Sequence, residues 1–105
     1  MFGKKSQFEN INVGQIQSEL EKGTTLVDIR NKEAFASGHI KGGINIPIRS
    51  LAFKLNLIDK SKPVMIICYV GGSSVTAAKF LSKAGYQVKN VVGGMQAWTG
   101  NLVTG

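Results

Sequence analysis

The single cysteine of the chain, Cys68, lies where an apolar run changes into small, flexible residues, in the segment Ile-Ile-Cys-Tyr-Val-Gly-Gly-Ser-Ser at positions 66–74. Such a change is typical of a buried strand that ends in a tight loop before a helix. The two glycines allow successive N–H groups to converge on one point, and the two serines can cap the helix. Converging amide dipoles favour the thiolate. The segment predicts a nucleophilic Cys68, with a small hydrophobic side chain that closes the core as the alternative.

Other kinds of cysteine site are excluded by the count alone. One cysteine cannot form an internal disulfide, and no second cysteine stands at the spacing that a zinc site requires. The chain has one histidine, His39, which is more typical of a structural residue among its neighbouring glycines. The sequence therefore predicts neither a metal nor a cofactor.

Composition indicates an ordinary globular chain. It has 105 residues, 43% hydrophobic and 18% charged, with a net charge of +7. This composition does not suggest disorder, and no apolar run is long enough to span a bilayer. The positive charge predicts attraction to anions, but scattered lysines without interleaved aromatic residues argue against nucleic acid. The first residues contain no apolar block of signal-peptide length, so we expect a cytoplasmic protein.

Periodic segments alternate between strand and helix along the chain. Five segments have the apolar pattern of strands: 8–11, 24–29, 44–46, 64–68 and 88–92. Helical spacing or capping signals mark 13–20, 32–37, 50–57, 74–84 and 94–98. The run at 64–68 is apolar without alternation, which indicates a central strand covered on both faces.

This alternation predicts an α/β fold with a mainly parallel sheet and helices on both faces, because each parallel crossover needs its own helix. We expect one domain over residues 1–105, with residues 1–6 flexible. Cys68 then ends a central strand at the carboxyl edge of the sheet, where such folds bind ligands.

Two longer motifs resemble the rhodanese-like sulfurtransferase family over nearly the whole chain. The first is Leu-Val-Asp-Ile-Arg at 26–30, followed by Gly-His-Ile at 38–40 and Asn-Ile-Pro at 45–47. The second is the Cys68 segment followed by Gly-Tyr at 85–86 and Gly-Gly-Met-Gln-Ala-Trp at 93–98. The resemblance implies a five-stranded parallel domain, a catalytic Cys68, and a persulfide-binding loop made of Tyr69, Val70, Gly71, Gly72, Ser73 and Ser74.

The resemblance also implies the reaction. A small anionic donor such as thiosulfate, or a persulfide, gives its sulfane sulfur to Cys68, and a thiol or cyanide then accepts it. In the family His39 belongs to a structural turn, and Trp98 is expected to complete the core. Two alternatives remain: a carrier module that accepts sulfur from a protein persulfide donor, and an inert interaction domain.

The active loop departs from the family pattern, because many members resemble Cys-Arg-x-Gly-x-Arg whereas this chain has Tyr69 and Ser73 instead. Each missing guanidinium removes a charge-assisted hydrogen bond of about 1.5 to 3 kcal/mol to an anionic donor. Arg49 is therefore a candidate donor-binding residue, with a plain surface arginine as the alternative. Asp28 and Arg30 are expected to form an ion pair that braces the mouth of the site, or else to orient the active loop.

A related chemistry is excluded by two positions. Cysteine-dependent phosphatases need an arginine six residues after the cysteine to grip a phosphoryl group, and that position holds Ser74. Ile67 also stands where such enzymes typically have a histidine. Phosphatase and arsenate reductase activities are therefore not expected.

Overall fold

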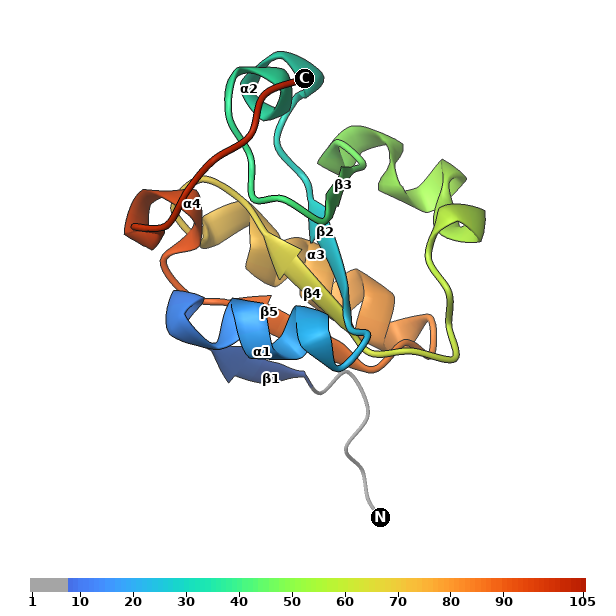
Figure 1. Ribbon diagram of the computed structural model, residues 1–105. Helices are drawn as coiled ribbons and strands as arrows, with labels where there is room; N and C mark the ends of the chain where they lie inside the picture. The colour runs from blue at the N-terminus through green and yellow to red at the C-terminus, as the bar shows by residue number, and fades with distance from the viewer. Residues whose placement is uncertain (1–7) are drawn as a thin grey trace.

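The computed structural model describes residues 8–105 and contains one five-stranded sheet (Figure 1). All neighbouring strands are parallel, in the order β1-β5-β4-β2-β3. The strands are β1 (Glu9–Ile11), β2 (Thr25–Asp28), β3 (Gly43–Asn45), β4 (Val64–Ile67) and β5 (Val88–Val91). The predicted fold class is confirmed, with every strand within two residues of its expected bounds. The residues expected to be flexible, 1–6, lie outside the described part.

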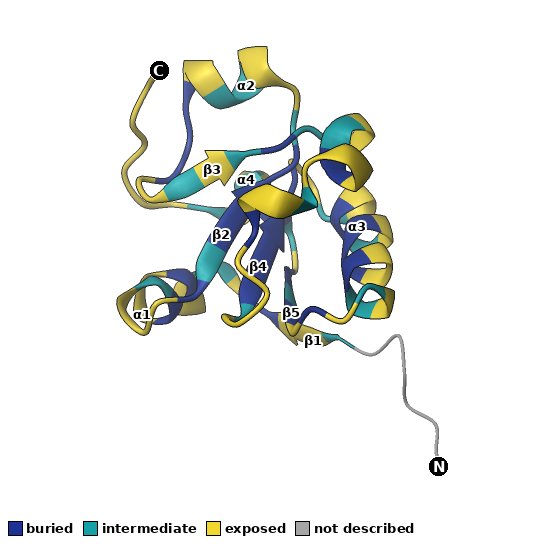
Figure 2. Ribbon diagram, turned by 90° about the vertical axis from the view of Figure 1, so that its right-hand side faces the viewer, coloured by how far each residue is buried: buried dark blue, intermediate teal, exposed yellow. Residues whose placement is uncertain are grey.

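Helices cover both faces of the sheet. They are α1 (Ile16–Glu21), which follows the 3₁₀ turn η1 (Val13–Gln15), α2 (Lys32–Ser37), α3 (Gly72–Lys83) and α4 (Gly94–Ala97). The α1 and α3 helices lie on opposite faces, and each turns its buried side toward the strands (Figures 1 and 2). No helix within residues 8–105 has both the length and the hydropathy needed to cross a membrane.

The central strand β4 separates two apolar cores. All four of its residues are completely buried, as a strand covered on both faces requires. Val64 and Ile66 pack into the core under α3, whereas Met65 and Ile67 pack into the core under α1. Cys68 continues the first series and belongs to the α3-side core. Tight packing around β4 therefore fixes where the loop after it begins.

One predicted helix is wrong in type. Residues 50–57 were expected to form a single helix, but the chain forms two 3₁₀ helices, η2 (Ile48–Phe53) and η3 (Leu55–Leu57). Only Leu51 is buried in these two turns, while Phe53 and Leu57 are exposed. A short α-helix depends on burial of one face, and so little burial does not support one here.

Candidate active site

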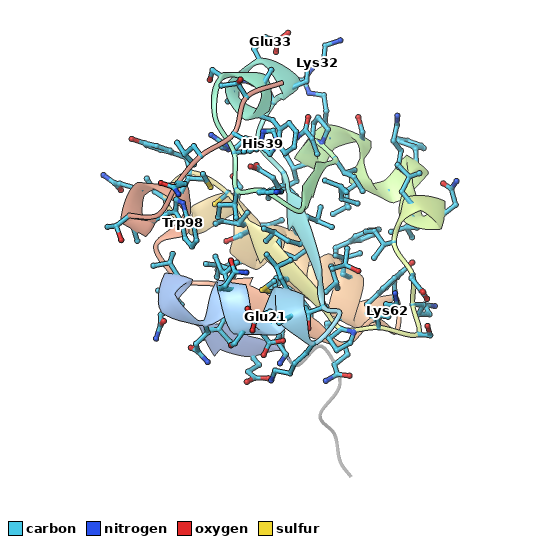
Figure 3. All side chains as sticks on the ribbon, viewed as in Figure 1. Glu21, Lys32, Glu33, His39, Lys62 and Trp98 are labelled. Atoms are coloured by element: carbon cyan, nitrogen blue, oxygen red, sulfur yellow. The ribbon has the colours of Figure 1, made fainter. Side chains whose placement is uncertain are left out.

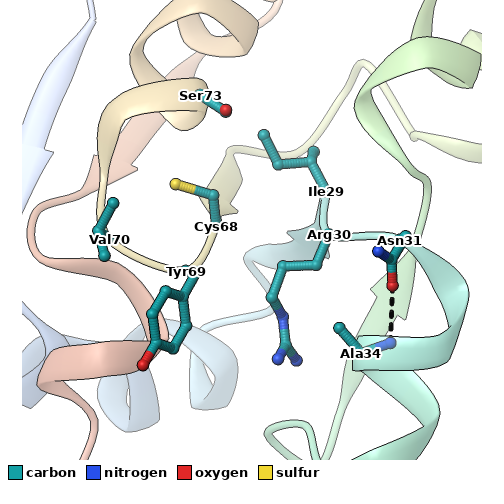
Figure 4. A pocket seen from close by; sticks show the side chains of 8 residues that line it. All are labelled: Ile29, Arg30, Asn31, Ala34, Cys68, Tyr69, Val70 and Ser73. Atoms are coloured by element: carbon teal, nitrogen blue, oxygen red, sulfur yellow. Dashed lines mark hydrogen bonds between the residues drawn. The ribbon is translucent and has the colours of Figure 1, made fainter.

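The ends of β2 and β4 meet at the carboxyl edge of the sheet. Asp28 is in register with Ile67, and the N–H of Ile29 donates to the Ile67 carbonyl at 3.0 Å. The segments that follow these two strands enclose a cavity of about 440 Å³ (Figure 4). Its lining residues are Ile29, Arg30, Asn31, Ala34, Cys68, Tyr69, Val70 and Ser73. The structure thus brings the two sequence motifs together around Cys68.

The Cys68 side chain lines this cavity and is almost completely buried. It is only 5% exposed and also belongs to the α3-side core. The N–H of Gly71 donates to the Cys68 sulfur at 3.0 Å. Gly71 has a φ of +107°, a conformation that residues with a side chain rarely adopt. A glycine at this position therefore lets the loop turn back and aim an amide at the sulfur.

The start of α3 differs in detail from the prediction. The helix begins at Gly72, two residues earlier than expected, and Gly71 is its N-cap residue without any side-chain capping bond. The expectation that serines cap this helix is wrong, because the Ser74 hydroxyl donates to the Gly71 carbonyl at 3.2 Å instead. Ser74 is fully buried, whereas Ser73 is exposed and lines the cavity. The first N–H groups of α3 have no partner within the helix, as at any helix start.

A contact from α4 holds the active loop from behind, and sequence reasoning missed it. The N–H of Met95 donates to the Cys68 carbonyl and that of Gln96 donates to the Tyr69 carbonyl, both at 2.8 Å. Gly94 has a φ of +60°, and a methyl group on it would collide with the Cys68 and Tyr69 carbonyls. The signal in the sequence is the Gly93-Gly94 pair, which allows α4 to approach this closely.

Asp28 and Arg30 form the predicted ion pair at the opposite wall of the cavity. Nη2 of Arg30 lies 2.7 Å from Asp28 Oδ2, and Nε donates to both carboxylate oxygens at 3.0 and 3.1 Å. Nη2 also donates to the Gly38 carbonyl at 2.8 Å. The Asn45 amide donates to the carbonyls of both Asp28 and Arg30. This wall is therefore held together by a continuous network.

The remaining predicted residues divide between the cavity and the surface. Tyr69 and Val70 line the cavity and are 58% and 55% exposed, so they form an apolar rim (Figure 4). Arg49 is exposed but is not among the lining residues. The cationic residue that lines the cavity together with Cys68 is Arg30. Among residues 8–105, no cluster of His, Cys, Asp or Glu side chains is suited to hold a metal ion.

His39 and Trp98 lie in different parts of the fold (Figure 3), and neither lines the cavity that contains Cys68. The ring of His39 stacks on Phe35 with 3.7 Å between centroids, and its Nδ1 lies 2.9 Å from the Phe35 carbonyl. The His39 backbone pairs in both directions with Val103. Trp98 packs against the α1-side core. Both arrangements agree with the structural roles expected for these residues.

Comparisons with known proteins lead to the family that the two sequence motifs resemble. The rhodanese-like domain family matches residues 12–101. The thiosulfate sulfurtransferase GlpE of Pseudomonas syringae pv. syringae is 36% identical over 94 residues, which cover 89% of each chain.

Two solved structures have closely similar folds. A rhodanese-related protein from Thermoplasma volcanium is 31% identical with a TM-score of 0.84, and the match covers 91% of this chain and 98% of that one. A NAD-dependent persulfide reductase from A. fulgidus is 34% identical with a TM-score of 0.72, over 88% of this chain but only 16% of that longer one. The prediction of a rhodanese-type sulfurtransferase is confirmed by these findings. The chain belongs to the rhodanese-like domain family.

Proposed function

We propose that the protein transfers sulfane sulfur from thiosulfate or a persulfide to a thiol or cyanide through a persulfide on Cys68. The observation that carries this proposal is the position of Cys68, which lines the cavity and whose sulfur accepts a hydrogen bond from the Gly71 N–H at 3.0 Å. An amide aimed at the sulfur stabilises negative charge on it. The similarity to a thiosulfate sulfurtransferase supports thiosulfate as a donor.

The reaction is two displacements at sulfur. In the first, the Cys68 thiolate attacks the sulfane sulfur of thiosulfate, the sulfur–sulfur bond breaks, and sulfite leaves with the bonding electron pair. In the second, an acceptor thiolate or cyanide attacks the outer sulfur of the persulfide, and the Cys68 thiolate leaves. Neither step transfers a proton, so anion stabilisation matters more than a general base. The eight residues lining the cavity include no His, Asp, Glu or Lys, which is consistent with this chemistry.

The loop from Tyr69 to Ser74 would surround the added sulfur. The Gly71 amide already donates to the cysteine sulfur, and the first amides of α3 are the donors nearest along the chain. The contacts from Met95 and Gln96 to the loop carbonyls keep these donors in place. A loop fixed before the donor binds does not have to be ordered during the reaction, which lowers the barrier.

A second function is favoured by one feature, the uncharged loop with its exposed rim of Tyr69 and Val70. Such a rim suits contact with another protein, so Cys68 would load mainly from a partner's persulfide. The domain then acts as a sulfur carrier. A domain of this kind within a longer persulfide reductase gives this alternative its support. We infer a cytoplasmic location for either function, and no role for nucleic acid or membrane.

Turnover measurements separate the two functions. With cyanide as acceptor, sulfur transfer should be measured with thiosulfate, with glutathione persulfide and with a persulfide-loaded cysteine desulfurase as the donor. The first function predicts turnover with a small donor, abolished in a Cys68→Ser variant. The carrier function predicts rapid loading from the protein donor and slow turnover with both small donors. Loading by none of the three donors would contradict both.

A further inference from the structure

Arg30 is the one formally charged side chain among the eight residues that line the cavity. It lies on the wall opposite the active loop, and that loop carries no formal charge from Cys68 to Ser74. The Arg30 side chain is 13% exposed and lines the cavity. An anion that enters the cavity therefore meets a single cation there.

The hydrogen bonds of the guanidinium leave part of it unused. An arginine side chain has five N–H donors, one on Nε and two on each terminal nitrogen. Nε bonds to Asp28, and Nη2 bonds to Asp28 and to the Gly38 carbonyl. Within residues 8–105, Nη1 makes no hydrogen bond or ion pair. Two donors on a group that is otherwise rigidly held therefore have no protein partner.

Asp28 offsets the charge of Arg30, but it does not accept hydrogen bonds from all the N–H donors of the Arg30 guanidinium. Asp28 is 2% exposed and does not line the cavity, so an entering anion meets the guanidinium rather than the carboxylate. The fixed pair gives Nη1 a defined direction, which favours an oxygen anion held by hydrogen bonds over a loosely attracted ion. This arrangement offers a replacement for the loop arginines that the chain lacks.

We propose that Arg30 is a donor-binding residue, whose Nη1 group binds an oxygen anion carried by the sulfur donor. This oxygen anion is either the sulfonate end of thiosulfate or a carboxylate of an organic persulfide. The residue then sets a preference for anionic over neutral donors. The proposal rests on the proposed function for its substrate, but not for its test, because anion binding can be measured without sulfur transfer.

The test compares two alkylating agents of nearly equal shape, iodoacetate and neutral iodoacetamide, both of which place a two-carbon group on Cys68. The measured quantity is the rate with iodoacetate divided by the rate with iodoacetamide. This ratio is then divided by the same ratio for N-acetylcysteine, which gives a normalised ratio. We expect a normalised ratio of about 3 to 10 in the wild-type protein, which falls to about 1 when the Nη1 donors are removed. The control Lys79→Gln removes a more exposed positive charge that does not line the cavity, and it should leave the ratio unchanged.

The variants must avoid an unpaired buried carboxylate. Arg30→Gln alone leaves Asp28 without its partner, so Asp28→Asn with Arg30→Gln is the preferred pair, and circular dichroism checks that it folds. If neither variant folds, the wild-type ratio is followed from about 0.02 to about 0.5 M salt. It should fall with salt because the iodoacetate rate drops while the iodoacetamide rate does not.

A protection experiment identifies the source of the anion. Sulfate stands in for the thiosulfate end and S-methylglutathione for an organic carboxylate, and each is tested for slowing the iodoacetamide reaction. Protection by either compound that is lost in the Asp28→Asn, Arg30→Gln variant supports the proposal and names the class. A wild-type ratio near 1, or a high ratio that survives this variant but is lost in Arg49→Gln, would overturn it.

Discussion

Arg30 and Lys89 each pair with a buried carboxylate, but they stand in different surroundings. The closest distances are 2.7 Å for Arg30 with Asp28 and 2.8 Å for Lys89 with Glu19, and the two cations are 13% and 12% exposed. Arg30 lines the cavity beside Cys68, whereas Lys89 lies on β5 between Glu19 and Glu9 and lines none of that cavity. The two pairs have similar closest distances and similar exposure, but only one of them borders the cavity.

Access decides what each pair can do. The Lys89 hydrogen bond is the main cause that lowers the pKa of Glu19 from 4.5 to about 2, and the Thr24 hydroxyl adds to it at 2.6 Å. That pair is satisfied by the protein itself and therefore stabilises the fold. Arg30 lines the cavity, and its Nη1 has no protein partner within residues 8–105. Changes near Arg30 should alter chemistry at Cys68, and changes near Lys89 should alter stability alone.

The largest expected effect comes from Gly94→Ala, on the cavity side of this comparison. The added methyl group collides with the Cys68 and Tyr69 carbonyls, and residue 94 also has a positive φ. We expect a loss of about 2 to 4 kcal/mol in unfolding free energy and at least a tenfold loss of sulfur transfer. Urea unfolding and turnover with glutathione persulfide measure the two effects.

The control for this change is Gly72→Ala. A methyl group there meets no atom within 4 Å, and Gly72 has no positive φ. Its unfolding free energy should equal or slightly exceed that of the wild type. Equal stability of the Gly94 and Gly72 variants would show that α4 does not constrain the active loop.

The second largest effect is expected from Glu19→Gln, which changes the Lys89–Glu19 pair. The change removes the negative charge that pairs with Lys89 and leaves one acceptor oxygen where Thr24 and Lys89 each had one. We expect about 1.5 to 3 kcal/mol less unfolding free energy, with turnover per folded molecule unchanged. Reduced turnover at full folding would mean that the two regions are coupled.

The pH dependence of stability sharpens the same contrast. The folded pKa of Glu19, about 2, lies below its ordinary value of 4.5, so this group stabilises the fold above pH 4.5. That contribution is lost as the pH falls from 4.5 toward 2. The difference in unfolding free energy between wild type and Glu19→Gln should therefore shrink over this range. A difference that stays constant from pH 6 to about pH 2 would contradict a depressed pKa.

The smallest expected effect is that of Arg49→Gln. Arg49 is exposed and does not line the cavity, so its loss should change unfolding free energy by less than about 0.5 kcal/mol. The Michaelis constant for thiosulfate should stay the same. A severalfold rise would instead favour the donor-binding role that the sequence suggested for Arg49, and would weaken the distinction drawn for Arg30.

Local patterns predicted most of this fold because its central strand is strongly apolar and many of its turns are marked by glycine. The unbroken run at 64–67 could only be a central strand, and Cys68 at its end had to reach the carboxyl edge. The prediction of one helix at 50–57 is wrong because Leu51 is buried whereas Leu55 is only half-buried and Leu57 is exposed, so no continuous helix face is buried.

The site was harder to predict than the fold because it depends on contacts between distant segments. The hydrogen bonds from Met95 and Gln96 join residues more than twenty positions apart. No local signal indicates which carbonyls accept them. Likewise, the order of residues placed Asp28 and Arg30 at one strand end, but only the cavity shows that Arg30 rather than Arg49 lines it. Three-dimensional placement, not residue type, separates these two arginines.

The most direct measurement is the intact mass of the protein after incubation with thiosulfate or glutathione persulfide. We predict a gain of one sulfur atom that maps to the peptide containing Cys68, disappears after cyanide treatment and is absent from Cys68→Ser. No gain with either donor, or an equal gain in the Cys68→Ser variant, would contradict a persulfide held at this cysteine.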